Sequence, residues 1–321
     1  MAICVEGDTL DDVMRHAISE LMETGAREAA TPVRGSNIES IGARLQLNNP
    51  RARLSQTESR RREVSAIGEL AWYLSGSNEA AQIAFWIPRY NLEAETDGRV
   101  HGGYGPRLFG QGPNDQFKRV IEQLRQSPGT RRAVVQIFDR SDTFGERKKD
   151  VPCTCTMQFL QRAGKLHMVV AMRSNDAVFG LPHDIFTFTM LQEIAANELG
   201  LELGEYVHLA ASLHMYDKSR GLAESFLSEG WQSTAGAQMP AMPSGPQTLS
   251  LAQFITAESQ VRAGVSYQSL DLPSEAYWAD LIRLLALRVA LRSRDGVGSE
   301  TITLAMVNEE LAEFARLLGA T

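Results

Sequence analysis

One mostly apolar segment lies between short strand-like segments, and it most limits how this chain can fold. Residues 185–199 (IFTFTMLQEIAANEL) are long enough for a helix and so apolar that we expect the helix to be buried. The strand-like segments are short and rich in β-branched or large apolar residues. They cover residues 131–138, 157–160 and 166–172 before the helix and 207–215 after it. The sequence therefore predicts a buried helix beside a sheet.

Further helices are expected on both sides of this region. Residues 9–24 place apolar side chains at helical spacing after two candidate N-caps, Asp8 and Thr9. Residues 63–76 form an apolar helix that contains Glu69 and ends at a glycine. A stretch rich in Gly, Pro, Ser and Ala, residues 230–248, predicts a long loop. The remaining expected helices are 115–126, 274–292 and 299–318.

Composition limits the kind of partner. The 321 residues include 39 acidic and 32 basic side chains, and the net charge of -7 offers no basic surface for a nucleic acid, which favours a free nucleotide. Three cysteines, Cys4, Cys153 and Cys155, are too few for a secreted disulfide framework. The chain opens without a signal-peptide pattern and has no apolar run of the roughly 18 residues that a membrane span requires. We therefore expect a cytoplasmic protein with no membrane partner.

Residues 150–216 contain the side chains that a pyrimidine-modifying enzyme needs. Because C5 of a pyrimidine is a poor nucleophile, enzymes that alkylate it first add a thiolate at C6, and Cys153 is the candidate. The alternative for Cys153 is a buried structural cysteine. Cys155 would share its strand face and is interpreted as packing. No second cysteine pair or spaced histidine set accompanies these two residues, so we expect no metal.

Three motifs in this region resemble those of the thymidylate synthase superfamily, whose members add a one-carbon unit from methylene-tetrahydrofolate to C5 of a pyrimidine nucleoside monophosphate. The motifs are DVPCTCTMQF, MRSNDAVFGLPHDIFTF and LHMY, within a likeness that covers roughly residues 34–222. The matching positions are Cys153, Arg173, Ser174, Asp176, Gly180, Pro182, His214 and Tyr216.

The resemblance implies an α+β fold in which a large twisted mixed sheet is flanked by helices, and a homodimer that forms through the sheet. Residues 1–222 would be the catalytic core. Residues 223–321 would be a divergent helical part packed on the same domain, without the short C-terminal segment that closes the active site in the family.

Arginines are the expected ligands of the substrate phosphate, because their planar fork suits its oxygens. The resemblance assigns this role to Arg173 with Ser174, and it places the charge of Arg173 near the nucleophile, where it would favour the thiolate. Arg131 and Arg132 match a pair that crosses the dimer interface to the partner's phosphate, and Arg34 matches an N-terminal phosphate ligand. For each arginine the alternative is a solvated surface side chain.

Glu69 is a candidate for proton transfer, since an apolar helix would raise its pKa unless the carboxylate finds a partner. The resemblance matches it to a glutamate that works with ordered water. It also matches His214 and Tyr216 to ligands of the sugar 3'-hydroxyl, and Asp176 and Gly180 to residues that line the folate site.

Asp184 carries the substrate prediction, because the family has asparagine at this position. Uracil offers a donor at N3 and an acceptor at O4, which an amide complements, whereas cytosine offers the reverse pattern. A carboxyl group accepts from the 4-amino group and, when protonated, donates to N3. Asp184 therefore favours a cytosine nucleotide, and Thr154, where thymidylate synthases usually have histidine, favours a remodelled base site. The alternative for Asp184 is an N-cap of the helix at 185–199.

The product depends on whether hydride or water reaches the C5 methylene that forms after the folate leaves. Tyr90 takes the place of a family tryptophan near this intermediate and could hold water, although Trp86 is an alternative for that position. We therefore predict a dCMP or CMP 5-hydroxymethylase. The alternatives are a dCMP 5-methyltransferase, a thymidylate synthase acting on dUMP, and a non-catalytic nucleotide-binding regulatory relative.

Overall fold

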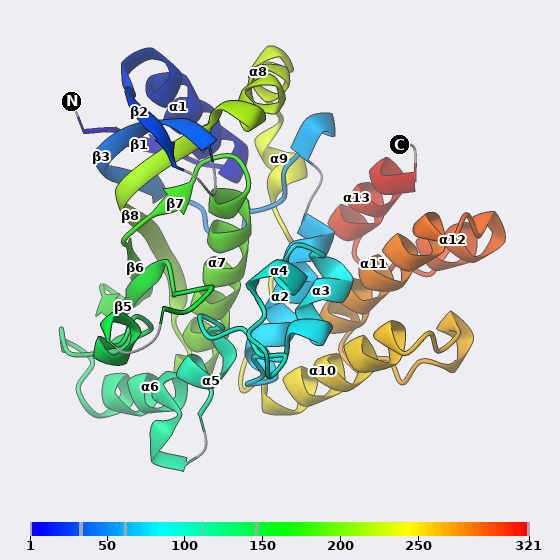
Figure 1. The fold of residues 1–321 in the computed structure, drawn as a ribbon. Helices are drawn as coiled ribbons and strands as arrows, with labels where there is room; N and C mark the ends of the chain where they lie inside the picture. The colour runs from blue at the N-terminus through cyan, green and yellow to red at the C-terminus, as the bar shows by residue number, and fades with distance from the viewer. Residues whose placement is uncertain (1, 32–34, 61–62, 111, 145–146, 320–321) are drawn as a thin grey trace.

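A mixed β-sheet forms the centre of the computed structural model, which describes residues 2–31, 35–60, 63–110, 112–144 and 147–319 (Figure 1). Over these residues the sheet has eight strands in the order β1-β3-β8-β6-β5-β4, with β2 beside β3 and β7 beside β8. The strands are β1 (Cys4–Gly7), β2 (Ala26–Thr31), β3 (Gly35–Leu47), β4 (Val134–Gln136), β5 (Thr154–Arg162), β6 (Lys165–Met172), β7 (Asn175–Asp176) and β8 (Glu202–Tyr216).

Both strand directions occur in the sheet. β3 and β8 pair antiparallel, as do β4 with β5 and β5 with β6, whereas β6 and β7 run parallel to β8. Only Ala163 and Gly164 separate β5 from β6, with φ of 48° and 77°. Both residues have positive φ, as the tight turns that match the twist of a hairpin require.

Helices cover one face of the sheet. The central helix α7 (Gly180–Leu199) packs on β6 and β8, and α1 (Leu10–Thr24) packs on β1 and β3. Thr9 caps α1 through a reciprocal pair of hydrogen bonds with Asp12. The other helices before residue 240 are α2 (Glu63–Leu74), α3 (Ala80–Trp86), α4 (Tyr90–Glu93), α5 (Gly105–Leu108), α6 (Gln116–Gln126), α8 (Arg220–Ser228) and α9 (Thr234–Ala237).

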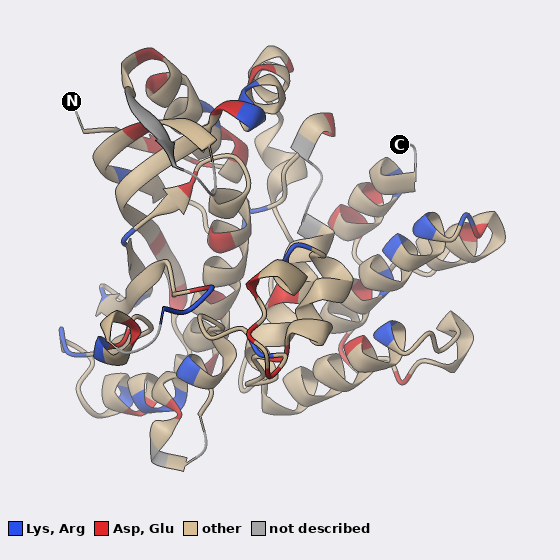
Figure 2. Cartoon of the chain, in the orientation of Figure 1, with Lys and Arg blue, Asp and Glu red and all other residues tan. Residues whose placement is uncertain are grey.

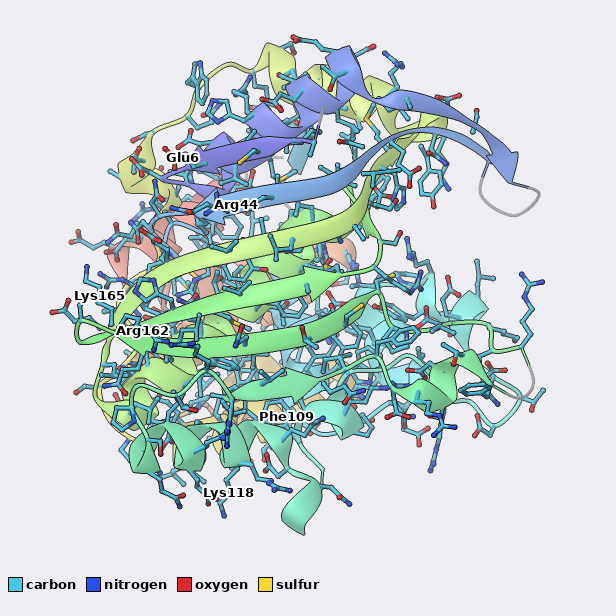
Figure 3. All side chains as sticks on the ribbon, turned by 90° about the vertical axis from the view of Figure 1, so that its left-hand side faces the viewer. Glu6, Arg44, Phe109, Lys118, Arg162 and Lys165 are labelled. Carbon is cyan, nitrogen blue, oxygen red and sulfur yellow. The ribbon has the colours of Figure 1, made fainter. Side chains whose placement is uncertain are left out.

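The opposite face of the sheet is open in Figure 3, where β8, β6 and β5 cross the front of the view. Residues alternate along β6, so that Met168, Val170 and Met172 are buried while Val169 and Ala171 lie partly exposed on the open face. Val134 on β4 is 40% exposed. The open face therefore presents apolar side chains to solvent.

The C-terminal third is a set of helices that packs against α2, on the side away from the sheet (Figure 1). They are α10 (Thr248–Arg262), α11 (Ala276–Arg292), α12 (Gly296–Leu304) and α13 (Glu309–Gly319). α10 and α11 both contact α2, and the indole of Trp278 is fully buried. These helices therefore fix the position of the helix that carries Glu69.

Most predicted elements are confirmed, with three corrections. The central helix begins at Gly180 rather than at residue 185. The helix predicted over 299–318 is two helices, because Asp280 accepts hydrogen bonds from the Val307 and Asn308 amides and interrupts it between α12 and α13. The predicted loop over 230–248 contains one helical turn, α9.

Charged residues of both signs are distributed over the elements in Figure 2. Within the described ranges, no helix is both long and apolar enough to cross a membrane.

Candidate active site

The predicted nucleophile lies directly before β5, beside the loop that leads out of β6. Cys153 is half-buried, and its carbonyl accepts a hydrogen bond from the Arg173 amide at 2.8 Å. The Arg173 side chain turns back to the same segment, with Nε donating to the Pro152 carbonyl at 2.9 Å and a terminal nitrogen to that of Val151 at 2.8 Å. The fold therefore places the positive charge of Arg173 beside the segment that carries Cys153.

Cys155 lies at an irregularity near the start of β5. The pairing of β5 with β6 shifts register between Thr154 and Thr156, so Cys155 is the extra residue of a bulge. Its carbonyl accepts from the amides of Ile137 and Phe138 at 2.9 and 3.2 Å. Cys153 and Cys155 are both half-buried and flank the buried Thr154, as expected of two cysteines on one face of this segment. The packing role of Cys155 stays a prediction.

Asp184 lies in the second turn of α7, next to β7. Asn175 donates a hydrogen bond from its amide nitrogen to Oδ2 of Asp184 at 2.6 Å. Burial of the carboxyl group and the nearby charge of Glu69 raise the pKa of Asp184 well above its usual range, against a smaller lowering by the Asn175 bond. Asp184 keeps part of its surface exposed. The raised pKa favours the protonated form of this partly exposed carboxyl group.

The N-cap interpretation of Asp184 is wrong, because α7 already begins at Gly180. The turn before the helix is held by Asp176, whose Oδ1 accepts from the Val178 and Phe179 amides at 2.8 and 3.2 Å. Gly180 matters for packing. A Cβ there would lie 3.1 Å from the amide nitrogen of Asn175 and 3.6 Å from Oδ2 of Asp184, so glycine leaves room for that pair.

Glu69 is buried in α2 but is well partnered. Its Oε1 accepts from the Tyr90 hydroxyl at 2.8 Å, and its Oε2 lies 3.0 Å from Nδ1 of His183. Burial raises the pKa of Glu69, but the hydrogen bond and charge of His183 and the bonds from Tyr90 and Tyr73 lower it below its usual value. The expectation of a raised pKa is therefore corrected: the carboxylate stays ionised because three side chains stabilise its charge.

His183 is a member of this cluster that the sequence interpretation missed. Its Nδ1 contacts Glu69, and its Nε2 lies 3.2 Å from the Ser65 hydroxyl, one helical turn before Glu69 on α2. The available signal was the PHD motif itself, in which a histidine precedes Asp184.

Tyrosine rings connect the Glu69 cluster with the nucleophile. Tyr73 and Tyr104 have ring centroids 5.0 Å apart, and the Tyr104 hydroxyl accepts from the Thr154 amide at 3.2 Å. Burial, together with neighbouring negative groups, raises the pKa values of Tyr73, Tyr90 and Tyr104 well above their usual range, which keeps these hydroxyls protonated.

The structure brings Tyr90 to the cluster and gives Trp86 a different neighbourhood. Trp86 is 2% exposed, and its indole nitrogen donates to Glu258 of α10 at 2.6 Å. Its ring lies so close to Gly68 of α2 that a Cβ there would be 2.3 Å from the indole Cγ. Trp86 therefore packs α2, α3 and α10 together.

The remaining residues are the predicted ligands of the sugar and of the phosphate. His214 and Tyr216 lie at the end of β8 with ring centroids 5.0 Å apart. His214 lies opposite Asp176 where β8 pairs with β7. Half-exposed Ser174 follows Arg173, and Arg34 lies outside the described residues.

Arg131 and Arg132 stand away from Cys153 in their own chain. The neighbouring Ala133 carbonyl accepts from the amide of Phe159, six residues along from Cys153. At about 3.3 Å per strand residue this separation is roughly 20 Å. Both arginines are exposed at the edge of the open sheet face.

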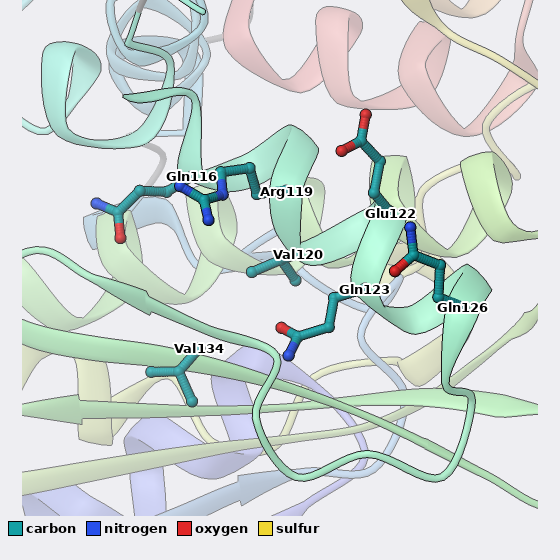
Figure 4. Close-up of a pocket in the computed structure, with 7 residues that line it drawn as sticks. All are labelled: Gln116, Arg119, Val120, Glu122, Gln123, Gln126 and Val134. Atoms are coloured by element: carbon teal, nitrogen blue, oxygen red, sulfur yellow. The ribbon is translucent and has the colours of Figure 1, made fainter. Parts of the chain in front are cut away.

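A hollow of about 430 Å³ lies between α6 and β4 (Figure 4). It contains no predicted site residue; its lining is Gln116, Arg119, Val120, Glu122, Gln123, Gln126 and Val134. Among the described residues, no group of three or more His, Cys, Asp or Glu side chains is arranged to hold a metal ion.

Comparisons with known proteins found a matching family and several relatives. A family model described as thymidylate synthase matches residues 11–253, a longer span at both ends than the likeness seen in the sequence. A deoxyuridylate hydroxymethyltransferase of Pseudomonas phage M6 is 30% identical over 152 residues, which are 47% of this chain and 43% of that protein. A thymidylate synthase of Bacillus mojavensis is 28% identical over 162 residues, 48% of this chain and 57% of that protein.

The matched parts therefore span about half the length of these relatives. Among solved structures, a thermostable thymidylate synthase A from Bacillus subtilis has a TM-score of 0.58 at 22% identity, covering 71% of this chain and 86% of that one. This likeness concerns the fold, and it confirms the predicted α+β architecture with its mixed sheet.

Proposed function

This chain belongs to the thymidylate synthase family, and we propose that it is a cytidylate 5-hydroxymethylase that uses methylene-tetrahydrofolate and water. The observation that carries the proposal is the Asp184 carboxyl group, held by Asn175 and raised in pKa by burial and by Glu69. A neutral carboxylic acid donates one hydrogen bond and accepts others. This pattern complements cytosine, with donation to N3 and acceptance from the 4-amino group.

The same proton has a role in the chemistry. When the Cys153 thiolate adds to C6, the electron pair of the C5–C6 double bond moves toward C4 and N3, and N3 becomes basic. Protonated Asp184 supplies N3 with a proton, which makes C5 enamine-like and able to take the one-carbon unit. Arg173, which donates to the carbonyls beside Cys153, favours the thiolate.

Phosphate and sugar are proposed to bind around this centre. Arg173 and Ser174 would bind the phosphate, with Arg34 and, from the partner subunit of a homodimer, Arg131 and Arg132. Both residues of the pair are exposed and roughly 20 Å from Cys153 in their own chain, which suits a role in a second subunit. His214 and Tyr216 would bind the sugar, and either dCMP or CMP is compatible with these ligands.

Methylene-tetrahydrofolate would supply the carbon, next to Asp176, Gly180 and Tyr90. The half-buried Tyr90 ring offers an aromatic face, and its hydroxyl is fixed on Glu69 at 2.8 Å. A fixed phenol hydroxyl beside a carboxylate provides polar partners for a water molecule, whereas a tryptophan at this position would exclude it. This polarity supports water over hydride as the last reactant.

A second candidate is hydroxymethylation of dUMP. It is favoured by the printed activity of the phage M6 relative, a deoxyuridylate hydroxymethyltransferase. Asp184 argues against it in its ionised form, because a carboxylate offers only acceptors and would oppose the O4 atom of uracil. A protonated carboxyl group has one donor and one acceptor and can face either base, whereas the asparagine of the family suits uracil alone.

Substrate choice can be tested by release of tritium from C5 of dCMP, CMP and dUMP in the presence of methylene-tetrahydrofolate. We expect release from a cytidylate with the unmodified protein, and a shift of preference toward dUMP by at least tenfold in Asp184→Asn, because the amide complements uracil. Cys153→Ser should abolish release with either base. Release from dUMP alone by the unmodified protein would contradict the assignment, and binding of dCMP without any release would indicate a regulatory relative.

A further inference from the structure

A hydrogen-bonded series of side chains joins α2 to the start of α7 beside the candidate base site. Nε2 of His183 lies 3.2 Å from the Ser65 hydroxyl, and Nδ1 lies 3.0 Å from Oε2 of Glu69. The other oxygen of Glu69 accepts from Tyr90. The His183 and Glu69 side chains are 14% and 7% exposed, so the series is largely shielded from solvent.

The contacts define which nitrogen of His183 can act as a base. An ionised Glu69 only accepts hydrogen bonds, so the ring nitrogen that faces it, Nδ1, carries the hydrogen. In the neutral ring Nε2 then has a free electron pair, which faces the Ser65 hydroxyl. A carboxylate, an imidazole and a hydroxyl in this order form the arrangement by which enzymes draw a proton from a hydroxyl group.

The series lies close to the groups that would hold the substrate. His183 directly precedes Asp184, and the charge of Glu69 contributes to the raised pKa of Asp184, so the two carboxyl groups lie near each other. Tyr73 lies near both carboxyl groups, and its ring centroid is 5.0 Å from that of Tyr104. The Tyr104 hydroxyl accepts from the Thr154 amide, next to Cys153. His183 is thus part of the same cluster as the proposed base-binding carboxyl group.

We propose that His183, positioned by Glu69 and Ser65, is the base that takes the proton from the water molecule that adds to the C5 methylene. This proposal rests on the function proposed above. The water oxygen forms a bond to the methylene carbon, the electron pair of that double bond moves into the ring, and N3 takes a proton from Asp184. The proton of the water passes to Nε2 of His183, directly or through the Ser65 hydroxyl.

The step balances over the cycle. N3 returns its proton to Asp184 when the Cys153 thiolate leaves C6 and the C5–C6 double bond forms again. The proton that His183 releases to solvent offsets the one taken by the folate nitrogen on leaving. No oxidant or reductant is needed, because the one-carbon unit neither takes electrons from nor gives electrons to an external reactant.

A purely structural role for His183 is the alternative, because a buried carboxylate needs a partner. The two roles differ in the step they affect. Loss of a structural partner would disturb binding and every chemical step, whereas loss of the base would spare release of the C5 hydrogen and reduce the capture of water.

The test uses the full-length protein with a C5-tritiated cytidylate, methylene-tetrahydrofolate and a small thiol, 2-mercaptoethanol, as a competing nucleophile. His183→Asn is the main variant, because an amide NH₂ can replace Nδ1 as the donor to Glu69 but offers no basic nitrogen. We expect the ratio of hydroxymethyl product to tritium released to fall about 100-fold, in keeping with the usual contribution of a general base. The thiol adduct should rise in its place.

Three further variants complete the test. Ser65→Ala should lower the same ratio by a smaller factor, and added imidazole should partly restore it in His183→Ala. His16→Gln is the matched control and should keep the ratio. His16 is a half-buried histidine on α1 whose Nδ1 contacts the Glu6 carbonyl of β1. If His183→Asn unfolds, the Ser65→Ala and imidazole experiments decide the question.

The outcomes separate the two proposals. An unchanged ratio in His183→Asn and Ser65→Ala, or a parallel loss of tritium release and product, would overturn the role of His183 and leave the hydroxymethylase intact. Absence of hydroxymethyl product in the unmodified protein would instead overturn the proposed function.

Discussion

At the level of single residues, the sequence identified side chains that belong to a recognisable motif. It missed side chains whose role depends on contacts with residues far away along the chain. Cys153 and Asp184 could be found because their neighbours along the chain form recognisable motifs. His183 could not be assigned a role, because its partners Glu69 and Ser65 lie 114 and 118 residues away. Asn175 was missed for a similar reason: only the early start of α7 brings it against Asp184.

The state of Asp184 leads to a prediction about pH. A carboxyl group with a pKa raised in the folded state keeps its proton where the unfolded chain has lost it, so its burial costs stability as pH rises. The cost is absent below the ordinary Asp pKa, grows above it and levels off once the raised value is passed. Asp184→Asn removes this cost, and we expect its stability gain to increase with pH by up to about 1.4 kcal/mol per pH unit in that window.

Urea unfolding of the ligand-free protein at a series of pH values from 4 upward would measure this gain. Asp8→Asn is the matched control for loss of a charge, since Asp8 is exposed and accepts from Asn48, which an amide oxygen can also do. A gain for Asp184→Asn that stays constant or shrinks as pH rises would mean that Asp184 is ionised in the folded state.

At the level of helices and strands, the spacing of apolar residues and the capping residues predicted most elements. Tertiary contacts explain the elements that were missed or misplaced. β3 was not predicted because glycine and polar residues interrupt its alternation; it is a strand because both β1 and β8 pair with it. α10 was missed because it buries polar side chains, including Glu258, which accepts from Trp86 and Arg262. The start of α7 was placed too late because it contains Gly180 and Pro182, although proline is tolerated in a first turn.

At the scale of the whole molecule, the sheet has one face covered by helices and one open face, and the sequence alone could not tell how residues 223–321 are arranged. The structure places α10 and α11 against α2, so these two helices support the helix that carries Glu69. This contact has no counterpart in any local sequence pattern, because it depends on side chains from three separate helices.

The open face leads to a prediction about assembly. We expect two copies to associate through it, since it presents apolar side chains such as Val169 and Leu209 and would bring Arg131 and Arg132 toward a partner. Val169→Asp should therefore yield a monomer with reduced activity, because a buried unpaired charge is costly.

Sedimentation velocity over a range of concentrations would measure the state of assembly. Val297→Asp is the matched control, because Val297 is 79% exposed on α12, away from the sheet. A monomeric unmodified protein that is fully active would contradict the role assigned to the open face and to the two arginines.

The proposed reaction adds a hydroxymethyl group to C5 of a cytidylate. The most direct measurement is incubation of the purified protein with dCMP, CMP or dUMP and methylene-tetrahydrofolate, followed by mass analysis of the nucleotide. We expect dCMP or CMP to gain the mass of one CH₂O unit. A gain of CH₂ on a cytidylate would show that hydride, rather than water, completes the reaction, and a product from dUMP alone would contradict the assignment of Asp184.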